Sequence, residues 1–378
     1  MLQNLMNTFV KFFNFFQSMQ TVRFISRNKN LFFHTLKGRV DNYFSERGLD
    51  PYANRQMVLK TFILLSLYII PFAVFCVFAF PVWANALLWA IMGVAMAGIG
   101  MSVMHDACHG AYSSNNFVNR ITGYTLNLLG GSVHNWKLQH NVLHHTYTNI
   151  AHMDHDVDDK VLFRFTPHSK RRWIHQYQYI YAFIFYGILS LYWVTIKDFA
   201  QFFRYIYLGV NRYSVFQNAK ILFRIILMKA GYFGVMFGIP MFTGHAFYEI
   251  LGCFLLMQGI SGLILTTIFQ MAHTVEGTTH PLPSETGNID NDWAIHQMHT
   301  TCNFAPRNRW LSWYIGGLNY QIEHHLFTKI CHVHYPAIAP IVRETAQEFG
   351  VPYLQQPTFG KALRSHIALL QQLGHLPS

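Results

Sequence analysis

The chain has 378 residues, of which 52% are hydrophobic and only 12% are charged. Soluble domains usually carry about twice that charged share, so the composition argues against two soluble domains and favours a protein that crosses a membrane several times. The formal net charge is +11, but the Lys and Arg residues are spread over several segments and are absent from two short connections. A nucleic-acid-binding protein would instead gather them in one basic patch, so this distribution excludes nucleic acid as a partner. The 22 histidines outnumber the 17 acidic residues, and neutral imidazole is a common ligand of transition metals.

The first 60 residues are expected to form a cytoplasmic N-terminal region. They carry nine of the 28 Lys and Arg residues, and cations accumulate on the cytoplasmic side of membrane proteins. Residues 1–20 contain neither a basic start nor a small-residue cleavage site, so we expect no secretory signal there. An amphipathic helix lying on the membrane surface, or an extended start, is expected instead.

Four apolar runs are long enough to cross the bilayer and organise a membrane domain over residues 61–342. They form two hairpins, because the connections 81–86 and 241–246 are short and contain no cation. Hairpin tips without cations face away from the cytoplasm. Lys229 lies near the start of the third run, where its ammonium is expected to reach the cytoplasmic surface. The four expected spans are residues 61–80, 84–104, 225–242 and 247–270.

Two further apolar segments are expected to lie at the membrane interface. Residues 116–131 are too polar to span comfortably, and residues 177–196 are long enough but hold five tyrosines, which prefer the interface. Parity supports the second assignment, because an even number of crossings must separate His145 from His324 if all histidine clusters build one site. The prediction is an all-α membrane protein with four transmembrane helices in two hairpins and a cytoplasmic helical cap that holds the site. Both termini are expected in the cytoplasm, with residues 343–378 forming one or two C-terminal helices.

Two histidine clusters follow the second run. His105 and His109 lie four residues apart, so they share one face if the helix continues past the run. His140 and His144 have the same spacing, and His145 points about 100° away from His144. Five imidazoles can therefore converge at the edge of a membrane helix, a pattern that packing alone does not require.

A third cluster lies far downstream. Gln321, His324 and His325 occupy positions i, i+3 and i+4 on one helix face, and His273 stands at the end of the last span. Eight histidines and a glutamine exceed what one four-coordinate zinc ion can use, whereas two metal ions could use them, and such nitrogen-rich ligands suit iron, copper or zinc. Adjacent histidines on a helix differ by about 100° in direction, so each pair can give one ligand to each metal.

Three acidic residues next to these clusters are expected to orient ligand imidazoles rather than to bind metal. A carboxylate that accepts a hydrogen bond from a ligand histidine fixes the tautomer and direction of its ring. Gln321 is expected either to bind metal or to act in the same way. The acidic residues are Asp106, Asp154 and Glu323, and the expected metal ligands are His105, His109, His140, His144, His145, His273, His324 and His325.

In these motifs the sequence resembles the membrane fatty acid desaturases, and it is most similar to the front-end type, which acts between an existing double bond and the carboxyl end. The two upstream clusters match the family's first two boxes, HxxxH and HxxxHH. The third box is HxxHH, with Gln in place of its first His in the front-end group, as in Gln321, His324 and His325. The resemblance covers roughly residues 41–340.

The resemblance implies a four-span bundle whose cap holds two iron ions, with O2 as co-substrate. The implied reaction converts –CH2–CH2– into a cis double bond in a fatty acyl chain carried by CoA, a carrier protein or a membrane lipid. Many eukaryotic members carry a fused cytochrome b5 domain with an HPGG motif, which does not occur here, and the N-terminal region is short. Electrons are therefore expected from a separate ferredoxin or cytochrome b5.

Related acyl-CoA enzymes also use the histidine at the end of the last span, which His273 matches, and place an Asn that holds a water four residues before it. Here Phe269 stands at that position, which leaves a ninth ligand open. A di-iron hydroxylase or ketolase fits the same residues, because it also begins with C–H abstraction, but Gln321 favours desaturation. The alternative outside this class is a membrane zinc protein without redox chemistry.

Overall fold

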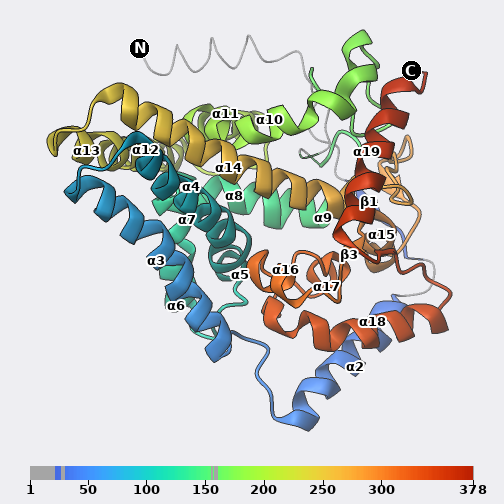
Figure 1. The fold of residues 1–378 in the computed structure, drawn as a ribbon. Helices are drawn as coiled ribbons and strands as arrows, with labels where there is room; N and C mark the ends of the chain where they lie inside the picture. Colours follow the sequence, from blue (N-terminus) through green and yellow to red (C-terminus); the bar gives the residue numbers. More distant parts are fainter. Residues whose placement is uncertain (1–21, 27–29, 155, 157–160, 378) are drawn as a thin grey trace.

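The computed structural model describes residues 22–26, 30–154, 156 and 161–377 (Figure 1). The start expected for residues 1–20 lies outside the described residues. Within the described ranges, strands occur only as two parallel pairs of two residues each, and the remaining regular structure is helical. The pairs are β1 (Arg23–Phe24) with β2 (Asn288–Ile289) and β3 (Asn303–Phe304) with β4 (Gln355–Gln356).

Five helices of the described residues are long and apolar enough to cross a membrane. Two of them are unbroken α-helices, α3 (Arg55–Val77) and α14 (Phe247–His273). The other three contain a π-helical turn. Through such turns α4 (Val82–Gly98) continues into α5 (Met104–His109), α10 (Gln178–Tyr192) into α11 (Asp198–Tyr207), and α12 (Val215–Phe233) into α13 (Ile239–Phe242).

All four expected spans lie largely within these helices. The helix Val82–His109 is continuous, so the residues of the second expected span and the first histidine cluster lie on one helix. The fifth candidate is Trp173–Tyr207, and it includes residues 177–196, which were expected to lie at the interface. Length and composition do not tell a crossing helix from one lying in the interface, so the four-span arrangement stays a prediction.

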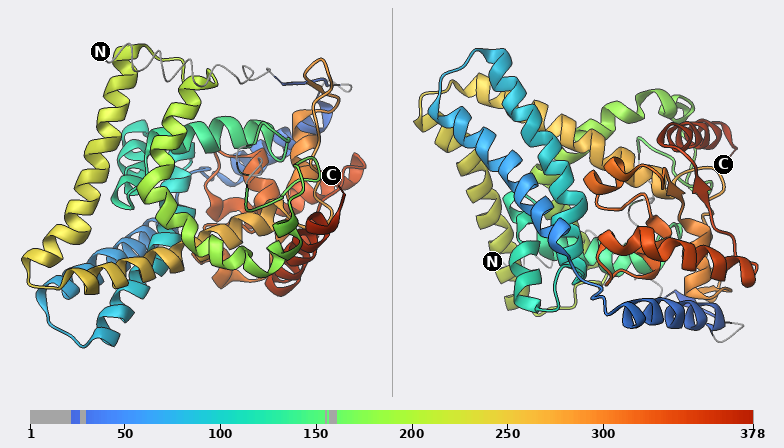
Figure 2. Two further views of the ribbon diagram at one scale, coloured as in Figure 1. Left: turned by 90° about the horizontal axis from the view of Figure 1, so that it is seen from above. Right: turned by 60° about the horizontal axis from the view of Figure 1, so that its bottom comes forward.

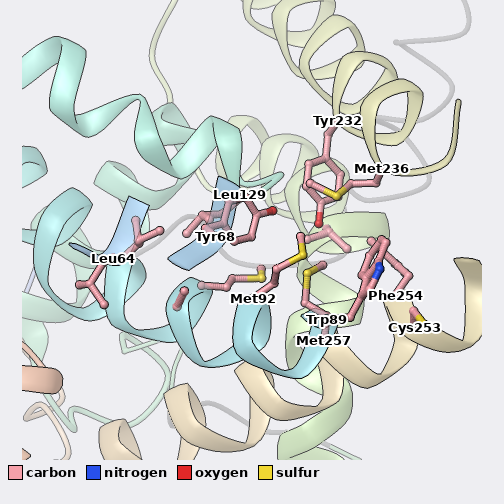
Figure 3. Packing of buried hydrophobic residues seen from close by; sticks show 14 of the residues in the cluster. Leu64, Tyr68, Trp89, Met92, Leu129, Tyr232, Met236, Cys253, Phe254 and Met257 are labelled. Carbon is pink, nitrogen blue, oxygen red and sulfur yellow. The ribbon is translucent and has the colours of Figure 1, made fainter. Parts of the chain in front are cut away.

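Close packing holds the membrane-length helices together (Figure 3). Trp89 of α4 is fully buried and makes edge-to-face ring contacts with Phe75 of α3 and Phe254 of α14. Gly93 lets α4 approach α14, because a Cβ at this position would lie 2.7 Å from the carbonyl oxygen of Met257. Between helices in lipid, such van der Waals contacts and small residues drive association.

Short helices connect α5 to the third membrane-length helix. Residues 116–131, expected at the interface, contain α6 and α7, and Phe117 and Ile121 on α6 are exposed, as a helix lying on a membrane surface requires. A π-helical turn, Lys137–His144, precedes the last short helix. The connecting helices are α6 (Asn116–Gly123), α7 (Thr125–Leu128), α8 (Val133–Trp136) and α9 (His145–Tyr147).

The C-terminal part of the chain forms a helical cap beside α5 and the end of α14 (Figures 1 and 2). The helix α2 (Leu31–Arg47) joins the cap by packing on α18. Of the segment expected to form one or two C-terminal helices, the described residues 343–377 form two helical parts, because Gly350 with φ of +65° and the following Pro352 end α18. The cap helices are α15 (Trp293–Thr300), α16 (Arg309–Tyr314), α17 (Gln321–Leu326), α18 (Tyr335–Glu348) and α19 (Phe359–His375).

Candidate metal centre

Segments far apart in the sequence bring the eight predicted histidines together. His105 and His109 lie on α5, which ends directly afterwards because Gly110 adopts the left-handed conformation, with φ of +77°. Seven of the eight side chains are buried, and His109 is half-buried. The six predicted histidines that are not on α5 lie on four other segments. These are the π-helical turn (His140, His144), the start of α9 (His145), the end of α14 (His273) and α17 (His324, His325).

The ring nitrogens gather in two adjoining groups, and within each group they lie within 4.8 Å of one another. His145 lies between the groups, since it clusters with His324 and His325 while its Nε2 is 3.2 Å from Nε2 of His140. The neighbours His324 and His325 face different groups, as their helical directions require. The first group contains His105, His109, His140 and His324, and the second contains His144, His273 and His325.

Several ring nitrogens have no hydrogen-bond partner among the residues that the structure describes. Nε2 atoms of His109, His144 and His324 are buried without a hydrogen bond to any described residue. Leaving a buried polar atom unpaired costs about 1–3 kcal/mol, and a metal ion would satisfy it. Burial and the neighbouring histidines lower the pKa of His145, His324 and His325 well below the ordinary value. These rings are therefore neutral, the form that binds metal, and the donor set fits transition-metal ions.

Asp154 is placed to orient His144. Its Oδ2 accepts a hydrogen bond from Nδ1 of His144 at 3.0 Å, which directs the other ring nitrogen into the second group. Burial alone would raise the pKa of Asp154, but His144 and the backbone N–H groups of Asn149 and Asp156 lower it to about 2. Asp154 is therefore a carboxylate at neutral pH and can hold the ring in one tautomer.

Asp106 lies behind His105 and belongs to a chain of buried contacts. Its Oδ1 is 3.5 Å from Nδ1 of His105, and its Oδ2 accepts a hydrogen bond from Nδ1 of His332 at 2.7 Å. The remaining ring nitrogen of His332 lies 2.7 Å from Nζ of Lys60, at the start of α3. Asp106 thus lies next to the His105 ring. Lys60, by contrast, is 272 positions from His332 in the sequence, and no local motif identifies such a contact.

Glu323 does not orient an imidazole. Its two carboxylate oxygens accept hydrogen bonds of 2.8 Å from the side chains of Asn303 and Tyr353. Burial raises the pKa of Glu323 to about 7, although these two hydrogen bonds lower it. Its contacts join α17 to β3 and to the segment that follows α18, so Glu323 positions the helix and not a ring.

Gln321 and Phe269 both lie at the second group. Nε2 of Gln321 is 2.8 Å from Nε2 of His273 and 3.2 Å from Nε2 of His325. The ring of Phe269 packs on His144 and His273 at centroid distances of 5.1 and 5.0 Å. The position that carries a water-holding Asn in related enzymes is therefore occupied by an aromatic ring.

The Trp136 side chain is a neighbour of the first group that sequence reasoning missed. Its ring stacks on His140 at 4.5 Å between centroids with an interplanar angle of 30°, and it also meets His105 and His109 edge-on. The only available signal is its position four residues before His140, which places both on one helix face.

A cavity of about 460 Å³ passes beside the two groups. Apolar side chains of α4, α10 and α14, such as Met96, Leu189 and Leu265, form much of its wall. His105 and His140 line the same cavity. An apolar cavity of this size with a few polar groups is the usual form of a small-molecule site. Its polar lining includes Gln139, Gln201, Arg204, Gln270 and Gln321.

Comparisons with known proteins agree with this arrangement. The family model described as fatty acid desaturase matches residues 81–357. The sn-1 linoleoyl-lipid 6-desaturase of Synechocystis sp. is 36% identical over 355 residues, which cover 92% of this chain and 96% of that protein. The acyl-lipid (8-3)-desaturase of Physcomitrium patens is 36% identical over 363 residues, covering 94% of this chain and 74% of the relative. The chain belongs to the fatty acid desaturase family.

Proposed function

We propose that this desaturase uses two iron ions and O2 to introduce a cis double bond into a fatty acyl chain. The observation that carries the proposal is the pair of adjoining groups of histidines, most of them buried, beside an apolar cavity. Iron bound there would supply the activation of O2 and the abstraction of hydrogen from an unactivated C–H bond. The balanced reaction is R–CH2–CH2–R′ + O2 + 2 e⁻ + 2 H⁺ → R–CH=CH–R′ + 2 H2O.

The chain's own residues would then have distinct tasks. The two groups of histidines, with His145 between them, would supply the metal ligands. Asp154 and Asp106 would orient ligand rings, because each contacts a ring nitrogen that faces away from the groups. Phe269 and Leu265 would exclude water from the acyl chain, since both line the cavity.

The acyl chain would be attached to a membrane lipid. The support is that the relatives from Synechocystis sp., Physcomitrium patens and Arthrospira platensis carry the words lipid or acyl-lipid in their names. Acyl-CoA and acyl-carrier-protein substrates are the alternatives. A separate ferredoxin or cytochrome b5 would deliver the electrons.

The test is to express the chain in a host that lacks the corresponding unsaturated fatty acids and to profile its lipids. We expect a new cis-unsaturated fatty acid in the glycerolipid fraction before it appears in the acyl-CoA pool. Metal analysis of the purified protein should give about two irons per chain, as two groups of nitrogen ligands require. A hydroxylated or keto product, or stoichiometric zinc without any product, would overturn the proposal.

A further inference from the structure

The ammonium group of Lys229 was expected to reach the cytoplasmic surface, but in the structure it is buried between neighbouring segments of the protein. Lys229 lies in the middle of the helix Val215–Phe242 and is 5% exposed. Its ammonium group donates to Oδ2 of Asp198 at 2.6 Å and to the backbone carbonyls of Gly130 at 2.7 Å and Trp193 at 2.9 Å. These contacts satisfy all three of its N–H donors.

Asp198 completes the arrangement from the other side. It is fully buried at the start of α11, and its Oδ2 also accepts a hydrogen bond from the backbone N–H of Ser132 at 3.0 Å. The backbone carbonyl oxygen of Asp198 accepts a hydrogen bond from the side-chain amide of Asn135 at 2.6 Å. The pair therefore ties α12 to two separate segments, the turn before α8 and the π-helical turn before α11.

Both of these segments form walls of the cavity. Leu129 and Gly131 line it from the first segment, and Trp193 and Val194 line it from the second. Among the described residues, none from α12 or α13 lines the cavity. Lys229 can therefore influence the shape of the cavity only through its three contacts, which are the backbone carbonyls of Gly130 and Trp193 and the carboxylate of Asp198.

The two walls leave little free space where they meet. A Cβ at Gly131 would lie 2.8 Å from the Leu126 side chain and 3.4 Å from the Trp193 ring. Next to it, Gly130 has φ of +83°, and Tyr232, on α12, packs so closely that a Cβ there would lie 2.9 Å from its ring (Figure 3). A small shift of either wall would thus change the shape of the cavity.

Stability alone is a weak reason for such a pair. Removing two charges from water is expensive, and well-packed apolar residues often replace a buried ion pair without loss of stability. We propose that Lys229 and Asp198 are positioning residues that fix the cavity walls and thereby decide which carbons of the acyl chain lie opposite the histidines. The inference rests on the proposed function, because it requires an acyl chain in this cavity.

The expected effect concerns selectivity. Apolar pockets distinguish ligands that differ by one methylene by only about 10–200-fold, so a wall that can move would let the chain slide by one or more carbons. Without the pair, the new double bond should appear at neighbouring positions as well as at its normal one. The KM should rise by about tenfold while kcat falls less, because substrate positioning is lost and not the metal ligands.

The decisive variant is the double substitution Lys229→Met with Asp198→Asn. Lys229→Met alone would leave a buried carboxylate without its cation and is expected to fold poorly, whereas the double variant removes both charges. We expect it to retain wild-type iron content, to produce positional isomers, and to show the raised KM. Lys220→Met is the matched control, since Lys220 is exposed on the same helix, and it should leave all three quantities unchanged.

The isomer ratio is measured on the products, so it does not depend on how much enzyme folds. If the double variant makes no product, Lys229→Gln combined with Asp198→Asn takes its place, because this pair also removes both charges but keeps a donor at position 229. A single double-bond position with unchanged KM in the variant that is active would overturn the inference. Failure of the wild-type chain to make any unsaturated product would instead refute the proposed function.

Discussion

Gln321 and His324 lie on the same face of α17 but have different neighbours. His324 belongs to the first group of ring nitrogens, and its buried Nε2 forms no hydrogen bond within the described part of the chain. Gln321 contacts the rings of His273 and His325. A side-chain amide is a weaker ligand than imidazole, so the two residues should differ in how strongly they affect metal binding.

We predict that His324→Ala abolishes desaturation and lowers iron content, because a metal-binding nitrogen is lost. Gln321→Ala should reduce activity by about 10–100-fold, the usual effect of removing a group that orients a ligand, with a smaller loss of iron. Activity assays and iron analysis on the same preparations check both statements. Full activity and full iron in Gln321→Ala would place Gln321 outside the site.

The substitution Gln321→His tests whether the side chain at position 321 faces a metal ion or the cavity. An imidazole that faces a metal should retain partial activity and full iron. An imidazole that instead projects into the cavity, which Gln321 lines, should block the acyl chain and leave iron content unchanged. The two results separate a ligand position from a substrate-facing position.

Among the elements, α19 is attached in part through one buried histidine. Nδ1 of His366 donates to the carbonyl of Thr274 at 2.7 Å, and its Nε2 accepts from the hydroxyl of Tyr186 at 2.9 Å. This ring joins α19 both to α10 and to the residue that follows α14. Burial lowers its pKa from 6.5 to about 4, so the folded protein keeps it neutral.

We predict that acid weakens this attachment. In the unfolded chain the ring binds a proton as the pH falls through 6.5, whereas in the folded protein it does so only near 4. Stability is therefore complete above pH 6.5 and declines between 6.5 and 4, by about 2 kcal/mol at pH 5 for this one group. His366→Asn should be less stable at pH 7 but should lose less stability between pH 7 and pH 5, as measured by thermal melting.

An exposed histidine on the same helix serves as the control. His375→Gln should leave the pH dependence of the melting temperature unchanged, since His375 is exposed. If His366→Asn and the wild type lose equal stability on acidification, the neutral ring of His366 does not contribute to the attachment.

The sequence predicts the long helices well, but it does not predict most of the contacts that form between distant segments. The helices α3 and α14 follow from long, mostly apolar runs, because such a segment in lipid can satisfy its backbone only as a helix. The convergence of the histidine clusters also follows from their helical spacing. The partner of Lys229 does not follow, since the pairing with Asp198 depends on how α12 packs against α11. The contact of Lys60 with His332 and the contacts of Glu323 likewise arise only from tertiary packing.

For the molecule as a whole, the shared site constrains how the chain crosses the membrane. The helix Val82–His109 contributes histidines from its C-terminal end to the first group, and the helix Phe247–His273 contributes one from its C-terminal end to the adjoining second group. Three membrane-length helices separate His145 from the third cluster. An even number of crossings is required if the site lies on one side, so one of the three does not cross, and the tyrosine-rich helix Trp173–Tyr207 is the proposed one.

Reporter fusions test this topology. Fusions after Leu162 and after Gly209, on either side of that helix, should give the same cytoplasmic signal. A fusion after Thr243, in the hairpin tip between α13 and α14, should give the opposite signal and serves as the control. Opposite signals at Leu162 and Gly209 would mean that Trp173–Tyr207 crosses the membrane and that the four-span arrangement is wrong.

The division of adjacent histidines between the two groups has a consequence for biosynthesis. His324 and His325 follow the last membrane-length helix, and each belongs to a different group. A ribosome that has translated every membrane-length helix has therefore completed neither group. Neither of the two proposed metal positions can therefore be completed during membrane insertion, so a chain that stops early would not carry an iron centre able to react with oxygen without a substrate.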